Sequence, residues 1–155
     1  MITPFLLFDG RAQEAANFYT SVFKSSKIES IAQYGDGRPG PKETAMSVTF
    51  WLDGLRFIAL NGGPQVAFTP AISLFVSCET QTEVDHLWTK LSEGGETQQC
   101  GWLRDKFGVT WQIVPSVLGE LLGDEDDEKS ARVMKAMLQM EKLDIAGLQR
   151  AYERA

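Results

Sequence analysis

TPAISLFVSC (residues 69–78) repeats the pattern of TPFLLFDG (residues 3–10), and this repeat decides the expected fold. Each segment contains a short apolar run typical of a buried strand. An amphipathic helix follows, with FYTSVF in the first half and HLWTKL in the second. Both halves then reach a Trp-Leu pair, a turn with glycine and another strand. The repeat predicts an α+β fold of two βαβββ modules, at about residues 1–63 and 68–116.

The first module contains the clearest hairpin of the sequence. Residues 45–61, AMSVTFWLDGLRFIALN, alternate as two strands, and Asp53-Gly54 between them is typical of a two-residue turn. Residues that are paired across such a turn point to the same side of the sheet. The expected pairs are Leu52 with Leu55, Phe50 with Phe57, Val48 with Ala59, and Met46 with Asn61.

Each module is expected to contain one helix between its strands. In the first, residues 12–23 place their apolar side chains at helical spacing. In the second, Thr80 and Glu83 form a capping box that starts the helix, and Gly94 and Gly95 end it. The expected buried stripes are Ala12, Ala15, Ala16, Tyr19, Val22 and Phe23 in the first helix, and Val84, Leu87, Trp88 and Leu91 in the second.

Residues 123–155 are expected to extend a single domain formed by residues 1–122. The extension begins with an acidic, solvated connector (residues 123–129), and residues 129–143 and 144–153 predict two amphipathic helices. Methionines at helical spacing indicate an adaptable core or interface, and a homodimer contact is one form of it. The buried candidates are Met134, Met137, Leu138, Ile145, Leu148 and Tyr152.

Composition and charge narrow the classes of function. The 155 residues carry a net charge of −6, and no basic stripe is present, so nucleic-acid binding is not expected. The apolar run near the N-terminus is too short for a membrane span or for the core of a signal peptide. Cys78 and Cys100 do not make a disulfide framework and are expected to be buried free thiols, which favours a cytoplasmic location.

The doubled unit and the FYTSVF helix resemble the vicinal oxygen chelate superfamily, which includes glyoxalase I, bleomycin-resistance proteins and extradiol dioxygenases. Residues 61–78, 100–115 (CGWLRDKFGVTWQIVP) and 132–153 resemble its PhnB-like group, which carries the label "3-demethylubiquinone-9 3-methyltransferase-like". This resemblance covers essentially the whole chain. It implies paired βαβββ modules, a cup-shaped mixed sheet around a pocket, and commonly a homodimer.

Enzymes of this superfamily hold a divalent metal with His, Gln or Glu side chains from four strands. The resemblance places these four positions at Pro4, Ala59, Ala71 and Gln112. Only Gln112 can donate a lone pair from its side chain, whereas a catalytic metal site normally needs about three protein ligands. We therefore expect no metal and no other cofactor.

The sheet face that contains Ala59 and Gln112 is expected to line the pocket, with helices on the opposite side. Because neither module can bury a sheet face alone, the two modules are expected to share this cavity. Its mixture of aromatic and apolar side chains with a few polar groups is typical of a small-molecule site. The candidate pocket residues are Gln112, Thr110, Asn61, Ser73, Phe50, Phe57, Phe75 and Met46.

Other kinds of chemistry have weaker support. His86 is the only histidine and lies at the margin of a helix stripe, and the sequence has no G-x-S-x-G elbow, so a hydrolase is not expected. Cys100 has no flanking base that would activate it. Asp105 and Lys106 precede a glycine and predict a hairpin turn. Methyltransferase activity is not expected, because no glycine-rich strand–loop–helix turn for S-adenosylmethionine is present.

Three functions remain open. The first is a metal-free pocket that binds a small, partly aromatic molecule, as bleomycin-resistance relatives do. The second is a superfamily enzyme (a lyase, isomerase or dioxygenase) whose metal site is degenerate or rebuilt around Gln112. The third is a structural or regulatory dimer whose cup is filled by its own side chains. Two features favour the first function: the metal ligands that are missing, and the mixture of apolar and polar side chains on the expected pocket face. A fold alone does not decide function.

Overall fold

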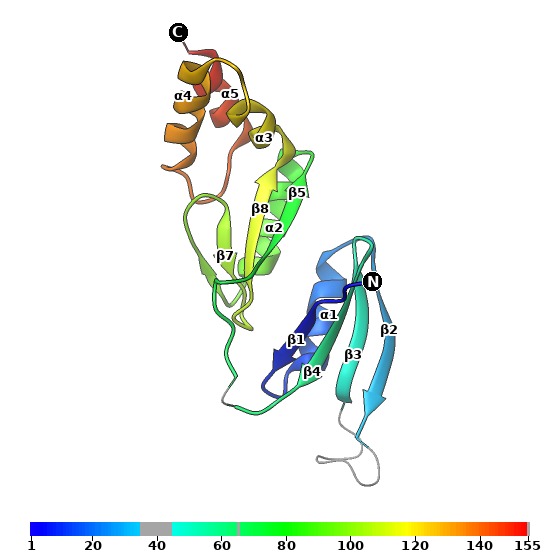
Figure 1. Cartoon of the computed structure of the whole chain (residues 1–155). Coiled ribbons are helices and arrows are strands. Elements are labelled where there is room, and N and C mark those ends of the chain that lie inside the picture. The colour runs from blue at the N-terminus through cyan, green and yellow to red at the C-terminus, as the bar shows by residue number, and fades with distance from the viewer. Residues whose placement is uncertain (35–44, 65, 155) are drawn as a thin grey trace. The chain divides into compact units, whose positions relative to one another are not determined.

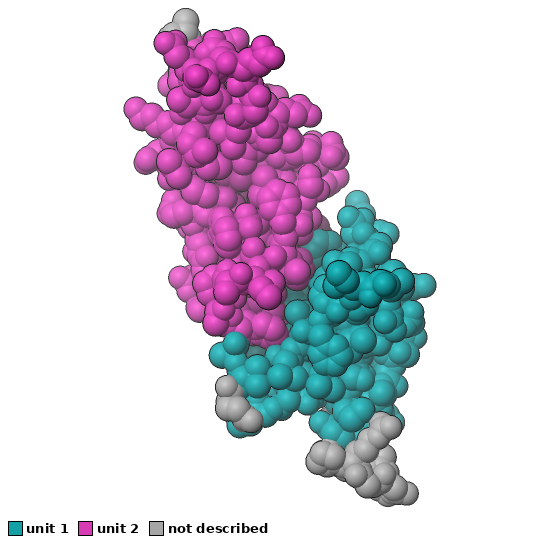
Figure 2. Space-filling model, viewed as in Figure 1, with its two compact units in different colours: residues 1–67 teal, residues 68–155 magenta. Residues whose placement is uncertain are grey.

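The computed structural model describes residues 1–34, 45–64 and 66–154. They form two compact units, Met1–Ala67 and Phe68–Ala155, which have different colours in Figure 2. Each unit contains the series βαβββ with its own four-stranded mixed sheet (Figure 1). The predicted α+β fold of two such modules is confirmed. The loop expected at residues 35–43 lies outside the described residues.

The first unit consists of β1 (Phe5–Phe8), α1 (Ala12–Val22), β2 (Ser26–Gln33), β3 (Ala45–Leu52) and β4 (Leu55–Asn61). Its sheet has the strand order β1-β4-β3-β2. β1 runs parallel to β4, and the other two pairs are antiparallel. The single parallel pair follows from the connection through α1, β2 and β3, which returns β4 beside β1 in the same direction.

The β3–β4 hairpin has the turn that the sequence predicts. Asp53 and Gly54 have φ values of 47° and 83°, and positive φ at both central residues is the requirement of a type I′ turn. Both strands begin and end where their alternation predicts. The confirmed pairs are Val48 with Ala59, Phe50 with Phe57, and Leu52 with Leu55.

Small side chains bring α1 close to the sheet. Ala12, Ala15 and Ala16 are completely buried, as the predicted stripe requires. Tyr19, one turn further along, stacks on Phe50 of β3 with 6.2 Å between the ring centroids. Because the alanines leave little bulk on the helix, aromatic rings fill the space between helix and sheet at the density of a protein interior.

The second unit begins with β5 (Ser73–Cys78), α2 (Gln81–Ser92), β6 (Glu96–Thr97), β7 (Trp102–Arg104) and β8 (Thr110–Pro115). Its sheet has the order β5-β8-β7-β6, which matches the first sheet position by position. β5 runs parallel to β8, as β1 runs parallel to β4. The internal repeat of the sequence is therefore also a repeat of topology.

α2 begins at a cap that differs in one detail from the predicted capping box. The Thr80 side chain accepts a hydrogen bond from the Glu83 backbone N–H, as expected. The Glu83 carboxylate accepts from the backbone N–H of Glu79 rather than from that of Thr80. Both contacts satisfy backbone donors at the start of the helix. The buried stripe is the predicted one: Val84, Leu87, Trp88 and Leu91.

Three helices follow β8: α3 (Ser116–Leu122), α4 (Asp127–Met137) and α5 (Ile145–Glu153). Their apolar sides meet the end of β8 in one cluster, so they belong to the second unit. Within the described ranges, none of the helices combines the length and apolar character that crossing a bilayer requires. The buried members of the cluster are Val114, Leu118, Val133, Leu143 and Leu148.

The buried side of α4 differs from the predicted one. Met134 and Leu138 were expected in the core, but they are 41% and 54% exposed, so this expectation is wrong for both. Val133 is completely buried in their place. The helix also ends at Met137 rather than at residue 143, because the chain then crosses back over the loop that precedes β7. Leu148 is buried as predicted.

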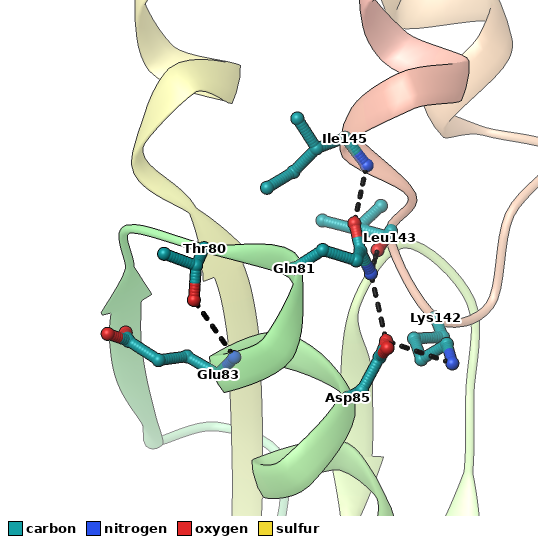
Figure 3. Close-up of polar contacts among 7 residues, drawn as sticks. All are labelled: Thr80, Gln81, Glu83, Asp85, Lys142, Leu143 and Ile145. Carbon is teal, nitrogen blue, oxygen red and sulfur yellow. Dashed lines mark hydrogen bonds and ion pairs between the residues drawn. The ribbon is translucent and has the colours of Figure 1, made fainter.

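A glutamine at the start of α2 holds the segment between α4 and α5 (Figure 3). The Gln81 side chain donates to the carbonyl of Leu143 (3.1 Å) and accepts from the backbone N–H of Ile145 (2.8 Å). The same amide nitrogen donates to Asp85 (2.9 Å), whose carboxylate lies 3.0 Å from the Lys142 ammonium. These two donors, Gln81 first and Lys142 second, lower the pKa of Asp85.

Backbone hydrogen bonds join the same segment to the loop before β7. The N–H groups of Cys100 and Gly101 donate to the carbonyls of Met140 and Glu141, both at 2.8 Å. The Thr97 hydroxyl donates to the Glu141 carboxylate at 2.9 Å. The C-terminal extension is therefore attached to the second module by polar contacts as well as by its apolar cluster.

Candidate functional site

The candidate site lies on the side of the second sheet that α2 does not cover. Gln112 is in the middle of β8, and its registered neighbours are Phe75 on β5 and Trp102 on β7. Registered residues on adjacent strands point to the same face. An amide therefore lies between two aromatic side chains in a line across the sheet. We call these three residues, Phe75, Gln112 and Trp102, the Gln112 row.

The Gln112 row is accessible within its unit. The Phe75 side chain is 61% exposed, and Gln112 and Trp102 are half-buried. Trp111 and Ile113, which alternate with Gln112 along β8, are buried beneath α2. The predicted orientation of β8 is therefore the observed one, with its largest apolar side chains on the helix side.

A hydrogen bond fixes the polar centre of the row. The Gln112 amide nitrogen donates to the Ser73 hydroxyl at 2.9 Å. Within the described residues, no further hydrogen bond is made by the Gln112 amide oxygen or by the Ser73 hydroxyl proton. One acceptor and one donor thus remain next to each other, between two aromatic side chains.

Two other residues of this face are not accessible. Thr110, which was expected to line the pocket, is registered with Ser73 but only 2% exposed. Val114 is buried in the cluster with the C-terminal helices. The accessible part of the face consists of the Gln112 row and Ser73, with Ser77 and Arg104 at its margins.

A buried carboxylate shapes the turn that leads into β8. Asp105 is 2% exposed, and one of its oxygens accepts from the backbone N–H groups of Phe107 (2.9 Å) and Val109 (3.0 Å). Its other oxygen accepts from the indole N–H of Trp111 (2.9 Å). The expected turn at Asp105 is present, and the same carboxylate also orients Trp111, the residue before Gln112.

In the first unit, the sheet faces the opposite way from the expectation. Phe50 and Phe57 were expected to line the pocket, but both are buried on the side of α1, and their rings stack with centroids 5.3 Å apart. Tyr19 of α1 completes the stack. The expected orientation is therefore wrong for this hairpin, although its register is right.

Asn61 has a structural role in the same unit. Its amide oxygen accepts from the backbone N–H of Ala12 (2.8 Å), and its amide nitrogen donates to the carbonyl of Ala45 (2.8 Å). The first contact caps α1, whose own N-cap residue Arg11 provides no side-chain cap. Asn61 therefore joins the start of α1 to β3 instead of pointing into a pocket. Met46, the other pocket candidate of this strand pair, is half-buried.

The helix-free side of the first sheet carries a different polar group. The indole N–H of Trp51 donates to the Glu29 carboxylate (3.0 Å), and Arg56 lies 3.3 Å from the same group. The Trp51 hydrogen bond, followed by Arg56, lowers the pKa of Glu29. Sequence reasoning missed this group, because it expected the pocket on the opposite face of the sheet and did not consider Trp51 as a site residue.

The donor set does not fit a superfamily metal site. Of the four positions that the resemblance indicates, Pro4, Ala59 and Ala71 have no side-chain donor, and Ala59 is buried on the side of α1. Gln112 supplies one neutral amide, and its nitrogen is bonded to Ser73. Among the residues that the structure describes, no group of three His, Cys, Asp or Glu side chains could hold a metal ion. Hard and borderline divalent cations need more than one amide ligand.

Neither the two cysteines nor the histidine belongs to the Gln112 row. Cys78 is completely buried, and burial, followed by the charges of Glu83 and Glu79, raises its pKa to about 11. Such a thiol stays protonated and unreactive at neutral pH. Cys100 is half-buried in the loop before β7, and His86 is on an exposed part of α2.

Trp102 is the member of the row that sequence reasoning missed. The turn beginning at Asp105 contained the necessary information, because an antiparallel hairpin closed there registers Trp102 with Gln112. The length of that turn was not assigned from the sequence, so the partner of Gln112 on β7 was not identified.

Comparisons with known proteins identify the family. A family model described as 3-demethylubiquinone-9 3-methyltransferase matches residues 1–114. A solved structure of a PhnB protein from Bacillus cereus is 41% identical, over 74% of this chain and 98% of that chain, with a TM-score of 0.69. A search of curated proteins finds no match. The family match ends before α3, so the C-terminal helices lie outside it, contrary to the expected extent of the resemblance.

More distant structures share the fold. A protein from Pseudomonas aeruginosa is 24% identical, over 74% of this chain and 96% of that chain, with a TM-score of 0.63. The fosfomycin resistance protein FosX from Listeria monocytogenes is 13% identical, over 80% of this chain and 97% of that chain, with a TM-score of 0.58. The chain therefore belongs to the PhnB-like 3-demethylubiquinone-9 3-methyltransferase family.

Proposed function

We propose that this protein binds a small, partly aromatic molecule at the Gln112 row without a metal ion. The observation that supports this proposal is the line of Phe75, Gln112 and Trp102 across one face of the second sheet. A planar ring can stack on either aromatic side chain, and an offset or edge contact of this kind contributes about 0.5–1.5 kcal/mol. The amide between the two side chains can then set the orientation of the ligand.

The polar centre selects for a particular ligand chemistry. The Gln112 oxygen can accept a hydrogen bond, and the Ser73 hydroxyl can donate one while it accepts from the Gln112 nitrogen. An aromatic ring that carries an amide, or another adjacent donor and acceptor, matches both groups. Each such hydrogen bond contributes about 0.5–1.5 kcal/mol net.

The activity in the family's description is not part of this proposal. The connections from β1 to α1 (residues 9–11) and from β5 to α2 (residues 79–80) contain a single glycine between them, whereas nucleotide-type cofactors use glycine-rich turns at such positions. The alternative remains a superfamily enzyme with a rebuilt metal site. Gln112 favours that alternative, because it is the one indicated ligand position that retains a donor.

Ligand-observed NMR with benzamide tests the proposal. Benzamide combines a ring with an amide, whereas cyclohexanecarboxamide lacks the aromatic ring and toluene lacks the amide, so benzamide should bind most tightly. Phe75→Ala and Gln112→Ala should each weaken binding about two- to ten-fold. The matched controls are Phe5→Ala, at a 57% exposed phenylalanine of the first unit, and Gln149→Ala, at an exposed glutamine of α5.

Equal binding of the three compounds, or equal losses in the control variants, would contradict the proposed site. Elemental analysis of the purified protein separates the two functions. Stoichiometric Zn, Ni, Mn or Fe would contradict the metal-free site. Metal-dependent glyoxalase or dioxygenase turnover that is lost in Gln112→Ala would establish the alternative.

A homodimer is the assembly that we propose for the chain. Met134 on α4 and Leu138, the C-cap residue of that helix, lie one turn apart, and both are exposed, as expected of an apolar contact between copies. Sedimentation of the wild type and of the Met134→Glu, Leu138→Glu variant tests it. A wild type that is still monomeric at a concentration of about 100 µM would count against the dimer.

A further inference from the structure

The first unit contains an open cavity that the proposed function does not use. Its volume is about 450 Å³, and it lies between the connection from α1 to β2 and the β3–β4 turn. Its position is on the first unit, whereas the Gln112 row belongs to the second. The lining residues are Lys24, Ser25, Ser26, Lys27, Trp51 and Gly54.

Hydrogen bonds fix the walls of this cavity. The backbone N–H of Asp53 donates to the carbonyl of Ser25 at 2.7 Å, which joins the β3–β4 turn to the connection after α1. The Ser26 hydroxyl donates to the carbonyl of Thr20 at 2.8 Å, at the end of α1. A Cβ at Gly54 would meet no atom within 4 Å outside Gly54 and its two chain neighbours, so the cavity is open at this residue. Hydrogen bonds thus hold the connection after α1 against both the end of α1 and the β3–β4 turn, at the base of the cavity.

The cavity has a local positive charge on an acidic protein. Lys24 and Lys27 both line it, while the whole chain has a net charge of −6. Among the described residues, neither ammonium group forms an ion pair. Glu29 is the nearest carboxylate along β2, and its oxygens are already bonded to Trp51 and Arg56. Asp53 is the other acidic group beside the cavity, and its side chain is exposed.

The aromatic wall of the cavity has a fixed orientation. Lys27 and Trp51 are registered partners on β2 and β3, so the ammonium and the indole point to the same side of the sheet. The hydrogen bond from the indole N–H to Glu29 restrains the ring at its edge. A half-buried, restrained aromatic face next to two cations can hold the apolar part of a ligand while the cations hold its anionic part.

We infer that this cavity binds a small organic oxyanion, such as an aryl phosphate or aryl sulfate. The oxyanion lies between Lys24 and Lys27, and the ring lies against Trp51. Ligand binding here is independent of the Gln112 row, so either site can be present without the other.

A second basic cavity of about 350 Å³ provides an internal control. It is lined by Arg132, Lys135, Gln139 and Arg154, together with Ala136 and Ala151. The Arg132 guanidinium is already bonded to the carbonyls of residues 151 and 152, at the C-terminal end of α5. That end carries partial negative charge from the helix dipole, which disfavours an anion. Among the described residues that line this cavity, none is aromatic.

NMR titration of the full-length, ¹⁵N-labelled protein with phenyl phosphate tests the inference. The Trp51 indole N–H should shift, and binding should weaken as salt is added. An exposed ion pair contributes about 0.2–1 kcal/mol, so each lysine should account for about a 1.4- to five-fold change in affinity. The Lys24→Gln, Lys27→Gln variant should therefore bind about two- to 30-fold more weakly. The matched double variant Lys135→Gln, Arg154→Gln should bind like the wild type.

Two further measurements make the test independent of any folding defect. Asp53→Asn removes the adjacent negative charge and keeps a residue that tolerates positive φ, so it should tighten binding. Phenyl phosphate should bind more tightly than methyl phosphate to the wild type, and Trp51→Leu should remove this preference. Unchanged affinity in the lysine double variant, shifts confined to residues 132–154, or no preference for the aryl compound would each overturn the inference.

Discussion

Replacing Asp105 with asparagine should remove one charge-assisted hydrogen bond from the β7–β8 turn and keep two others. An asparagine can still accept from the backbone N–H groups of Phe107 and Val109 with its single oxygen. The position of the second carboxylate oxygen would then hold an NH₂ group, which faces the indole N–H of Trp111 as donor against donor. Both groups are buried, so water cannot replace the lost contact without cost.

The expected loss of stability follows from this geometry. A hydrogen bond to a charged group contributes about 1.5–3 kcal/mol, and Asp105→Asn should lower the free energy of unfolding by a similar amount. Asp105→Ala should cost more, because it also removes the acceptor of two backbone N–H groups. Asp9→Asn, at an exposed aspartate, is the matched control and should change stability by no more than about 0.5 kcal/mol.

Urea denaturation followed by far-UV circular dichroism measures these changes, and a double-mutant cycle isolates the contact. Trp111→Phe removes the indole N–H, so Asp105→Asn should cost about 1–2 kcal/mol less in that background. Additive losses in the cycle, or an Asp105→Asn variant as stable as the wild type, would refute the assigned role of this carboxylate.

Three other outcomes are expected. Gln81→Ala should speed hydrogen exchange and proteolysis between α4 and α5 and cost about 1–3 kcal/mol, whereas Thr82→Ala, at the exposed neighbour, should do neither. Gly101→Ala should destabilise more than Gly10→Ala in thermal melts, because both have positive φ but only the Cβ at residue 101 would lie 2.8 Å from a backbone oxygen. The pKa of Cys78 is raised to about 11, so the folded protein keeps the thiol proton to a higher pH than the unfolded chain does. The contribution of Cys78 to the free energy of unfolding should therefore be constant below pH 8 and fall between pH 9 and 11 by at most about 1.4 kcal/mol per pH unit. Titrating Cys78→Ala in parallel should show that this part of the decrease is absent.

The elements and the register of the β3–β4 hairpin could be predicted from local sequence. Asp53 and Gly54 determine a turn of fixed length, and alternation on both sides determines which residues are paired. These are short-range properties, so one sequence is sufficient to read them. The helix stripes that end in Val22 and Leu91 follow from periodicity for the same reason.

The direction in which that hairpin faces could not be read from alternation. Alternation shows that Phe50 and Phe57 share a face, but both faces of this sheet carry large apolar side chains, so it does not show which face the helix covers. The composition of α1 contained a clue. A helix surface made of Ala12, Ala15 and Ala16 needs bulky partners on the sheet, and the phenylalanines provide them.

The buried face of α4 depends on contacts that are distant in sequence. Gln81 and Gly101 bind the segment after α4 by hydrogen bonds, so the helix ends earlier than its periodicity indicates. Val133 rather than Met134 then lies in the core. Local periodicity does not contain these contacts. The Gln112 row was predicted only in part. Its β5 member Phe75 was identified, whereas its β7 member Trp102 depends on a pairing that the sequence did not assign.

The C-terminal boundary of the second unit differs between the family match and the packing of α3–α5. As a member of its family the chain is matched to residue 114, but the apolar cluster that contains Val114 is completed by Leu143 and Leu148. A chain shortened to the matched segment would leave that part of β8 without its cover and the N–H of Gly101 without its acceptor. The segment that the family model covers is therefore shorter than the segment whose side chains pack together around the end of β8.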